Sequence, residues 1–330
     1  MIRHRFSVVV LVSVVLAVVG ANAPCLAQIG YGVNSAGNLF RFDTDSPAVV
    51  TTIGPVGFLP EGIDFRPSST TLYAIDIGPN TSRLYTIDIT TGTATPIGAG
   101  FNSSGSVNGA AYDLTVNQTF GFDVNPKTLQ ADTSIRIRLV GTSGVNLRLH
   151  SGTGDIAAVD TPLIISPSGA SPFVDGVAYI NNIAEIGGTT LLHDMDSRND
   201  KLYTQNPPNN GTLIEVGAFG ATIDALANIG FDIYTTPGDA DLTIGGDFGF
   251  AVLQRPDAPV GGPFGAYMLY DVNLATGAIT NGALVGPAAT PFDFVGGFSV
   301  LPIPIPEPSC FALVVFVAMS MTGVRRRRNN

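Results

Sequence analysis

Cysteine is almost absent from this sequence. Cys25 and Cys310 are the only two, and each lies in or beside an apolar segment near one end of the chain. The chain between these segments therefore has no disulfide, no thiolate metal ligand and no cysteine nucleophile. About 275 residues remain there, which is enough for a hydrophobic core to stabilise the fold without cross-links.

Positive charge is scarce as well, and Lys127 and Lys201 are the only lysines. Removing six terminal arginines and Glu307 from the 16 basic and 26 acidic residues leaves ten and 25, hence a net charge of −15. An acidic, lysine-poor surface argues against nucleic acid or an anionic membrane as a partner. It is compatible with divalent cations, or simply with solubility.

Tryptophan is missing, and no long segment between residues 28 and 305 has helical periodicity. The chain instead contains 39 glycines and 23 prolines, with alternating apolar runs of four to six residues between them. Residues 72–75 and 135–138 are examples of such runs. This composition predicts an all-β protein with many short strands and turns.

The N-terminal segment has the three parts of a secretory signal peptide. Arg3 and Arg5 precede an apolar run at residues 6–19, and small residues follow as far as Ala27. This order predicts export and cleavage by signal peptidase after Ala27. An uncleaved N-terminal anchor is the alternative.

The C-terminal segment has a different order of parts. It contains a Pro-Glu-Pro motif, a short apolar stretch and a basic cluster: Pro306, Glu307 and Pro308, residues 310–324, then Arg325, Arg326, Arg327 and Arg328. The apolar stretch is shorter than the ~20 residues of a typical transmembrane helix, and the arginines favour the cytoplasmic side. This order resembles the PEP-CTERM sorting signal of bacteria. The alternative is a plain membrane tail.

The PEP-CTERM resemblance implies that an exosortase-type transpeptidase recognises the motif, cuts nearby and leaves the protein in the cell envelope or outside the cell. The C-terminal segment would then be a transient membrane anchor. The two ends predict three regions: a signal peptide at residues 1–27, a folded domain at 28–303 and a sorting tail at 304–330.

A glycine-led apolar pattern recurs through the domain. We interpret each copy as the first strand of a repeat, at residues 62–65, 109–112, 176–179, 230–233 and 297–300. Pairs of strands joined by a polar turn recur at residues 39–54, 84–98, 147–160, 202–217 and 269–286. Another short strand lies between first strand and pair, as at residues 72–76, 119–123 and 191–196.

This repeat predicts a β-propeller of about five four-stranded blades. The domain begins at residues 31–33, which match a second strand, and ends at residues 298–300, which match a first strand. The C-terminal strand would therefore complete the first blade and close the ring, which removes two free sheet edges. Two alternatives remain: six blades, if residues 239–250 form a blade of their own, or a two-sheet β-sandwich.

Several segments resemble a family of secreted bacterial domains of unknown function. They are residues 62–67, 84–88, 120–123, 146–149 and 206–209. The resemblance covers roughly residues 30–235, and the sequence departs from it afterwards. It implies an exported domain and no particular chemistry.

Known catalytic signatures are absent, including the G-x-S-x-G and H-E-x-x-H motifs and a phosphate-binding glycine loop. The domain has two histidines. His150 occupies a turn position that is Asp or Asn in other copies, so we expect a role in the turn. His193 lies on a strand beside Asp194, whose side chain should point to the opposite face. We expect a solvated strand edge there rather than a metal site.

The residue before the glycine is polar in three of the first-strand copies: Glu61, Asn108 and Asp175. First strands line the channel of a propeller, so these side chains should converge on its axis, where Asp232 could add a fourth. Carboxylate and amide oxygens suit Ca²⁺, which makes it the candidate cofactor. The channel metal site of propeller lactonases is similar, by analogy of fold alone. The alternative is a wet channel lined by polar residues.

Two functions are compatible with these features. The first is a non-catalytic module of the cell surface or extracellular matrix that binds an extracellular polysaccharide or a protein. The second is a calcium-dependent hydrolase or lactonase with its metal in the channel.

Overall fold

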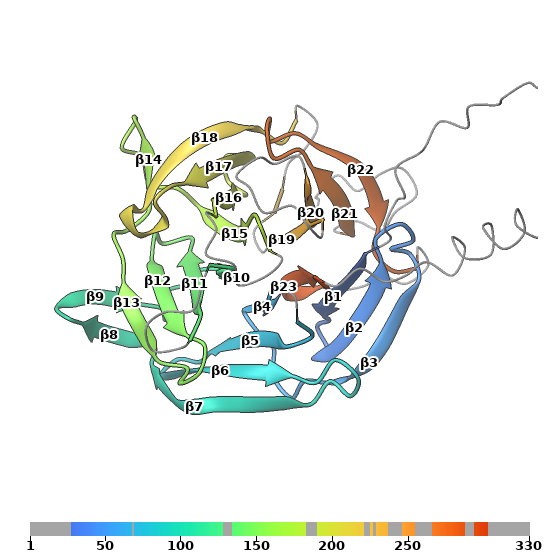
Figure 1. Ribbon diagram of the computed structural model, residues 1–330, viewed down its shortest axis with the longest axis horizontal. Helices are drawn as coiled ribbons and strands as arrows, with labels where there is room; N and C mark the ends of the chain where they lie inside the picture. Colours follow the sequence, from blue (N-terminus) through green and yellow to red (C-terminus); the bar gives the residue numbers. More distant parts are fainter. Residues whose placement is uncertain are drawn as a thin grey trace, which may run out of the picture.

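The computed structural model describes residues 28–67, 69–127, 134–182, 190–220, 225–226, 229–236, 246–254, 266–287 and 294–302. These residues form a ring of five sheets around a central axis (Figure 1). The protein is a five-bladed β-propeller, as the repeat predicts. The six-bladed and sandwich alternatives are wrong.

The first two blades follow the predicted strand order from the axis outwards. Blade 1 contains β23 (Val295–Val300), β1 (Ile29–Val33), β2 (Asn38–Asp43) and β3 (Val50–Pro55). Blade 2 contains β4 (Gly62–Phe65), β5 (Leu72–Ile77), β6 (Thr81–Ile87) and β7 (Ala94–Asn102). A separate two-stranded sheet follows, made of β8 (Ser104–Val107) and β9 (Ala110–Asp113).

The other three blades complete the ring. Blade 3 contains β10 (Phe120–Val124), β11 (Arg136–Gly141), β12 (Asn146–His150) and β13 (Ile156–Val159). Blade 4 contains β15 (Val174–Tyr179), β16 (Leu192–Asp196), β17 (Lys201–Gln205) and β18 (Thr212–Ala218), and β14 (Ile164–Ser166) adds a parallel strand to its outer edge. Blade 5 contains β19 (Gly230–Thr235), β20 (Asp247–Gln254), β21 (Tyr267–Val272) and β22 (Ile279–Leu284).

Ring closure by the C-terminal strand is confirmed. Strand β23 pairs antiparallel with β1, with Val300 opposite Gly30 and Phe298 opposite Gly32. Figure 1 shows β23 on the axis, beside the first strand of the chain. Blade 1 therefore consists of strands from both ends of the domain, and the ring has no open seam.

Two strand assignments need correction. Residues 109–112 are not an inner strand, because β9 pairs only with β8 in a hairpin inserted between blades 2 and 3. The inner strand of blade 3 is β10, which we had expected to be a second strand, and β11 is the true second strand. Residues 247–250, the end of the segment considered for a sixth blade, lie in β20, which is the second strand of blade 5.

The hydrophobic core is divided into layers between neighbouring blades rather than gathered at one centre. One layer, for example, joins Leu139 and Leu149 of blade 3 to Ile75 and Leu84 of blade 2. Another joins Phe40 of blade 1 to Val252 of blade 5, which seals the ring. The fold therefore depends on every blade contacting both neighbours.

Glycines let the outer parts of the blades approach closely. A Cβ on Gly98 of β7 would overlap the carbonyl oxygen of Thr153, in the outer turn of blade 3. Gly54 of β3 has the same relation to Thr91 of blade 2, and Gly217 of β18 to Thr276 of blade 5. Backbone contact thus joins these blades at the rim.

The predicted signal peptide and sorting tail lie outside the described residues, and so do the domain boundaries at residues 27/28 and 303/304. Within the described part of the chain, no helix has the length and apolar character needed to cross a membrane.

Candidate functional site at the propeller axis

The inner strands share a four-residue pattern that the fold places around the axis. It consists of glycine, an apolar residue, a small or acidic residue and a second apolar residue, at residues 62–65, 121–124, 176–179, 230–233 and 297–300. Each inner strand contacts the inner strands of both neighbouring blades. Equivalent positions therefore form rings around the axis.

The glycine ring allows the strands to come together. A Cβ on Gly62 would overlap the side chain of Phe122 in the next blade. Gly297, with φ of +83°, is more restricted, because its Cβ would overlap the backbone nitrogen of Ile63. No other residue type fits at these two positions without moving the neighbouring strand.

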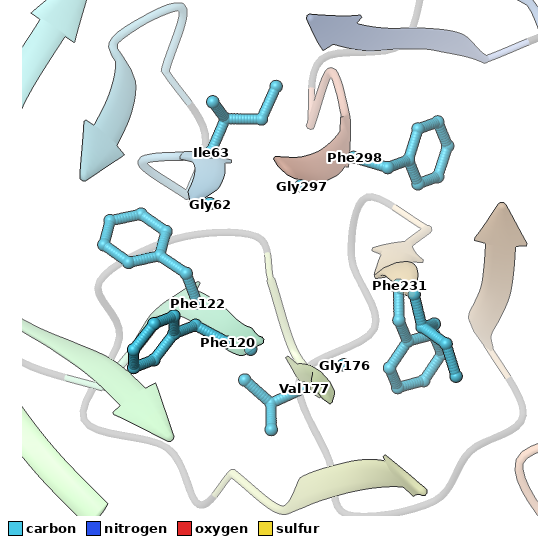
Figure 2. A pocket seen from close by; sticks show the side chains of 11 residues that line it. Gly62, Ile63, Phe120, Phe122, Gly176, Val177, Phe231, Gly297 and Phe298 are labelled. Carbon is cyan, nitrogen blue, oxygen red and sulfur yellow. The ribbon is translucent and has the colours of Figure 1, made fainter. Parts of the chain in front are cut away.

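A small funnel lies at the glycine end of the axis, with about 210 Å³ of empty space, part of it open to solvent. Figure 2 shows Phe122, Phe298 and Phe231 arranged around it. Its lining is apolar apart from backbone: Gly62, Ile63, Phe120, Gly121, Phe122, Gly176, Val177, Ile229, Phe231, Gly297 and Phe298. The funnel has room for about one water molecule, and its lining has no ionisable side chain.

The third position of the pattern forms a cluster of carboxyl groups. Asp64, Asp123 and Asp232 are each at most 2 % exposed, and one oxygen of each lies within 4.8 Å of the other two. Ser299 occupies the equivalent position on the closing strand β23. We call these four residues the axial cluster. Ala178 stands at the fifth position and contributes no polar atom.

The axial cluster joins four of the five pairs of neighbouring blades through hydrogen bonds to backbone amides. The Val124 N–H donates to Asp64 Oδ2 at 2.7 Å, and the Tyr179 N–H donates to Asp123 Oδ1 at 3.4 Å. In both pairs the donor belongs to the fourth pattern position of the following blade. These carboxyl groups therefore connect blade 2 to blade 3 and blade 3 to blade 4 by hydrogen bonds.

Hydrogen bonds of the same kind connect the blades on both sides of the closing strand. The Val300 N–H of blade 1 donates to Asp232 Oδ2 of blade 5 at 2.6 Å. The Phe65 N–H of blade 2 donates to Ser299 Oγ of blade 1 at 3.1 Å. The series is interrupted where Ala178 offers no acceptor, and there the Ile233 N–H donates to Asp232 Oδ1 of its own strand at 2.6 Å.

Burial dominates the electrostatics of the axial cluster. Desolvation raises the pKa of Asp64 and of Asp123 well above the ordinary aspartate value, and repulsion between the carboxylates adds to this. Desolvation also raises the pKa of Asp232, to about 7, although the amide of Val300 opposes the shift. A group of this kind can hold protons at neutral pH, or a cation in their place.

The structure corrects most of the expected channel site. Asp232 lies at the axis, but with Asp64 and Asp123 rather than with the three residues expected beside it. Asn108 does not approach the axis, because it is exposed in the β8–β9 turn. Glu61 is half-buried before β4, where burial and the charge of Asp76 raise its pKa. Asp175 is buried, but its Oδ2 accepts from the Ser197 hydroxyl at 2.8 Å rather than joining the cluster.

Sequence reasoning missed Asp64, Asp123 and Ser299, although the signal was present. These residues stand two positions after the pattern glycine, whereas Glu61 and Asp175 stand one position before it. The second copy of the pattern, the one that belongs to blade 3, begins at Gly121 and not at Gly109. With the correct glycine, the acidic or hydroxyl side chain recurs in four of the five copies.

The histidines are not part of the axial cluster. His150 has the expected turn role, because its Nδ1 accepts from the Gly152 and Thr153 amides, each at 3.1 Å. The expectation of a solvated edge at His193 is wrong. His193 and Asp194 are both at most 1 % exposed. Desolvation lowers the pKa of His193 to about 4, so it is neutral at physiological pH.

A second buried polar group lies between blades 3 and 4. The Arg138 guanidinium, 1 % exposed, donates to Asp160 Oδ2 at 2.7 Å, to Asn146 Oδ1 at 2.6 Å and to Asn209 Oδ1 at 2.9 Å. Arg148 donates to both oxygens of Asp160. The network joins blade 3 to the outer turn of blade 4, and we assign it a structural role.

These features define a closed five-bladed propeller with a buried carboxyl cluster on its axis. Residues 38–294 match the model of a family described as a domain of unknown function (DUF4394), and because the match covers more than half of the chain, this protein belongs to that family. The expected resemblance to a domain of unknown function is thereby confirmed. Its expected end near residue 235 is wrong, since the match continues through blade 5.

Several solved structures match this chain at low similarity. A proposed exo-beta-1,3-galactanase from Bifidobacterium bifidum has a TM-score of 0.44 and 12% identity, covering 77% of this chain and 87% of that one. A proposed 6-phosphogluconolactonase from Bacteroides uniformis has a TM-score of 0.37 and 11% identity, covering 82% and 84%.

BBS1N, solved in complex with ARL6DN, has a TM-score of 0.35 and 11% identity. The alignment covers 75% of this chain and 61% of BBS1N, so this chain spans less than two thirds of it. A search of the curated proteins gave no match. These similarities carry no argument about activity.

Proposed function

We propose that this protein is an exported, non-catalytic propeller module that an exosortase-type system sorts to the cell envelope or extracellular matrix, where it binds a polysaccharide or a protein. The terminal segments support export and sorting, since an N-terminal signal-peptide pattern is combined with Pro306-Glu307-Pro308, an apolar stretch and four arginines.

The use of the axial carboxylates supports a non-catalytic role. Each of the three accepts a backbone N–H of the neighbouring blade, so these groups hold the ring together. The funnel beside them is lined by glycines and apolar side chains. A catalytic carboxylate needs access to its substrate, and these side chains are buried on all sides. This is the observation that carries the proposal.

Replacing Pro306, Glu307 and Pro308 together with alanine tests the sorting step. In a host with an exosortase-type system, we expect the wild-type protein in the envelope or medium without its C-terminal segment. The variant should remain uncleaved in the cytoplasmic membrane. Immunoblots of the fractions, with a tag at the C-terminus, measure cleavage. A matched replacement of Pro302 and Pro304 should be sorted normally. Equal cleavage of all three proteins would contradict the proposal.

Protein recovered from the envelope or medium can be used to test the binding role. It should sediment with the extracellular polysaccharide or the envelope of its own host and should release no sugar from it. Release of reducing ends or ring-opened lactone products by the pure protein would contradict the non-catalytic assignment.

A calcium-dependent hydrolase is the second candidate, and the approach of three carboxylate oxygens to within 4.8 Å favours its metal-binding part. If this candidate is correct, removal of calcium by a chelator should lower the melting temperature by about 5 °C or more, and excess calcium should restore it. Under our first proposal the two melting curves coincide. Differential scanning calorimetry with metal analysis of the same sample distinguishes the two outcomes.

A further inference from the structure

Ser299 Oγ takes part in three hydrogen bonds at the axis. It accepts from the Phe65 N–H at 3.1 Å, and it lies 2.7 Å from Asp64 Oδ1 and 2.9 Å from Asp232 Oδ2. A serine hydroxyl has one hydrogen and two acceptor positions. It can donate to one of the two carboxyl groups only. The other contact is a hydrogen bond only if that carboxyl group supplies the hydrogen.

The partners of the two carboxyl groups decide where this hydrogen lies. Both oxygens of Asp232 accept backbone amides, from Ile233 at Oδ1 and from Val300 at Oδ2. Asp64 Oδ2 accepts the Val124 amide, and Asp64 Oδ1 faces Ser299 Oγ at 2.7 Å. The Phe65 amide also acts on the Asp64 carboxyl, but its 3.1 Å hydrogen bond is to Ser299 Oγ. Asp64 Oδ1 is thus the oxygen best placed to hold the extra hydrogen.

We infer that a proton resides on Asp64 Oδ1 and is donated to Ser299 Oγ, whose own hydrogen is donated to Asp232 Oδ2. This chain of hydrogen bonds joins blade 2, the closing strand and blade 5. It forms a proton-dependent clasp on β23, the strand that closes the propeller. Loss of the proton leaves two negative carboxylates facing one hydroxyl, which weakens the hold on the closing strand.

Among the described residues, no side chain beside the axial cluster supplies a positive charge that could take the place of this proton. Tyr73 lies opposite Asp64 on β5, Tyr31 lies opposite Ser299 on β1, and Phe250 lies opposite Asp232 on β20. On β11, Arg138 is opposite Asp123 but ion-paired with Asp160.

On the remaining inner strand, β15 contributes Ala178 at the third position, followed by Tyr179, whose hydroxyl accepts from Arg138 at 3.4 Å. The third carboxyl of the cluster, Asp123, lies beside Asp64 and supplies no positive charge, and its own pKa is raised by burial and by repulsion from Asp64. Among the described residues around the axis, the balance of charge therefore favours a bound proton.

The direction in which pH changes the stability follows from the burial of the carboxyl groups in the axial cluster. A carboxyl group whose pKa is raised on folding stabilises the fold fully below its unfolded pKa, about 4, and loses this contribution as pH rises through the folded pKa. Burial raises the pKa of Asp64, Asp123 and Asp232, the last to about 7. His193, with its pKa lowered to about 4, acts in the opposite direction only below about pH 6.5. The clasp should therefore weaken above neutral pH.

Asparagine variants of the two carboxyl groups provide a matched test. In Asp64→Asn the amide nitrogen can donate to Ser299 Oγ while the remaining oxygen accepts Val124, which imitates the protonated acid. In Asp232→Asn an amide nitrogen replaces an oxygen that must accept a backbone N–H. We expect Asp64→Asn to melt within about 2 °C of wild type at pH 6.5, and Asp232→Asn to melt about 5 °C lower or more.

The experiment uses the full chain in a mild detergent between pH 6.5 and pH 9. Wild type should lose about 5 °C in melting temperature over this range, with faster amide hydrogen exchange in β23, and Asp64→Asn should lose at most half as much. An exposed control, Asp113→Asn, should behave as wild type. The infrared carbonyl band of a protonated carboxylic acid should be present at pH 6.5 and reduced in Asp64→Asn.

Three results would overturn the inference. The first is a wild-type melting temperature that does not change with pH over this range. The second is an Asp64→Asn variant as unstable as Asp232→Asn. The third is the absence of the carboxylic acid band together with one equivalent of tightly held calcium, which would mean that a cation takes the place of the proton. A failure of the sorting or polysaccharide experiments would leave all three readouts unaffected.

Discussion

Gly297→Ala should destabilise the protein by about 3–5 kcal/mol, enough to prevent accumulation of the folded chain in many hosts. Gly297 is on the closing strand with φ of +83°, and a Cβ there would overlap the backbone of Ile63 and Gly62 in blade 2. Backbone atoms of a paired strand cannot rotate away as a side chain can. Alanine would therefore separate β23 from β4 and open the ring. Urea unfolding followed by tyrosine fluorescence measures the loss.

Gly109→Ala is a matched control for this prediction. Gly109 has nearly the same backbone angle, φ of +84°, but nothing lies within 4 Å of its Cβ position. Alanine at Gly109 has only the cost of the left-handed conformation, about 1–2 kcal/mol. The difference between the two variants isolates the overlap at the axis. Equal losses in both variants would show that close approach of the inner strands is not what requires glycine at residue 297.

Arg138→Met should also cost about 3–5 kcal/mol. Methionine roughly fills the space of the arginine chain but removes the donors to Asp160, Asn146 and Asn209, which are held between blades 3 and 4. Asp160, 6 % exposed in its side chain, would then keep only Arg148 as an ion-pair partner. The free energy of unfolding in urea measures this change.

Arg148→Met is the control for the second prediction. Its side chain is 30 % exposed and contacts the same carboxylate, so water can replace much of what is lost. We expect a loss of about 1 kcal/mol or less. If both arginine variants lost the same stability, the burial of Arg138 would have no special importance. A gain in stability for Arg138→Met would mean that apolar contact compensates for the whole network.

The propeller could be predicted from the sequence because each blade needs the same short strands and the same turn residues. The outer turns begin with Asp88 or Asn273, whose side chains accept from amides two and three residues ahead, and this requirement leaves a repeated signature. Ring closure was also visible, since the domain begins with a second strand and ends with a first. Both features result from short-range rules that each strand and turn must satisfy.

The axial cluster was harder to predict because its hydrogen bonds join residues that lie far apart in the sequence. Asp64 accepts the amide of Val124, 60 residues away, and no spacing within one blade reveals such a bond. The β8–β9 hairpin also hides the second copy of the pattern, since residues 109–112 imitate the glycine-led inner strand. The polar residue before the glycine, as at Glu61 and Asp175, is the one from which the sequence predicts a channel site. The acidic residue two positions after the glycine is the one that faces the next blade.

The closing strand also determines how the propeller should respond to tension. Strand β23 runs antiparallel to β1, and Leu301 and Ile29 are hydrogen-bonded at the same end of the pair. A force that pulls these two ends apart would load the hydrogen bonds one at a time, as in opening a zipper, rather than all together in shear. A protein held at one end and pulled at the other would therefore yield first at blade 1 and at low force. The four remaining blades would lose their closure before any of them began to unravel.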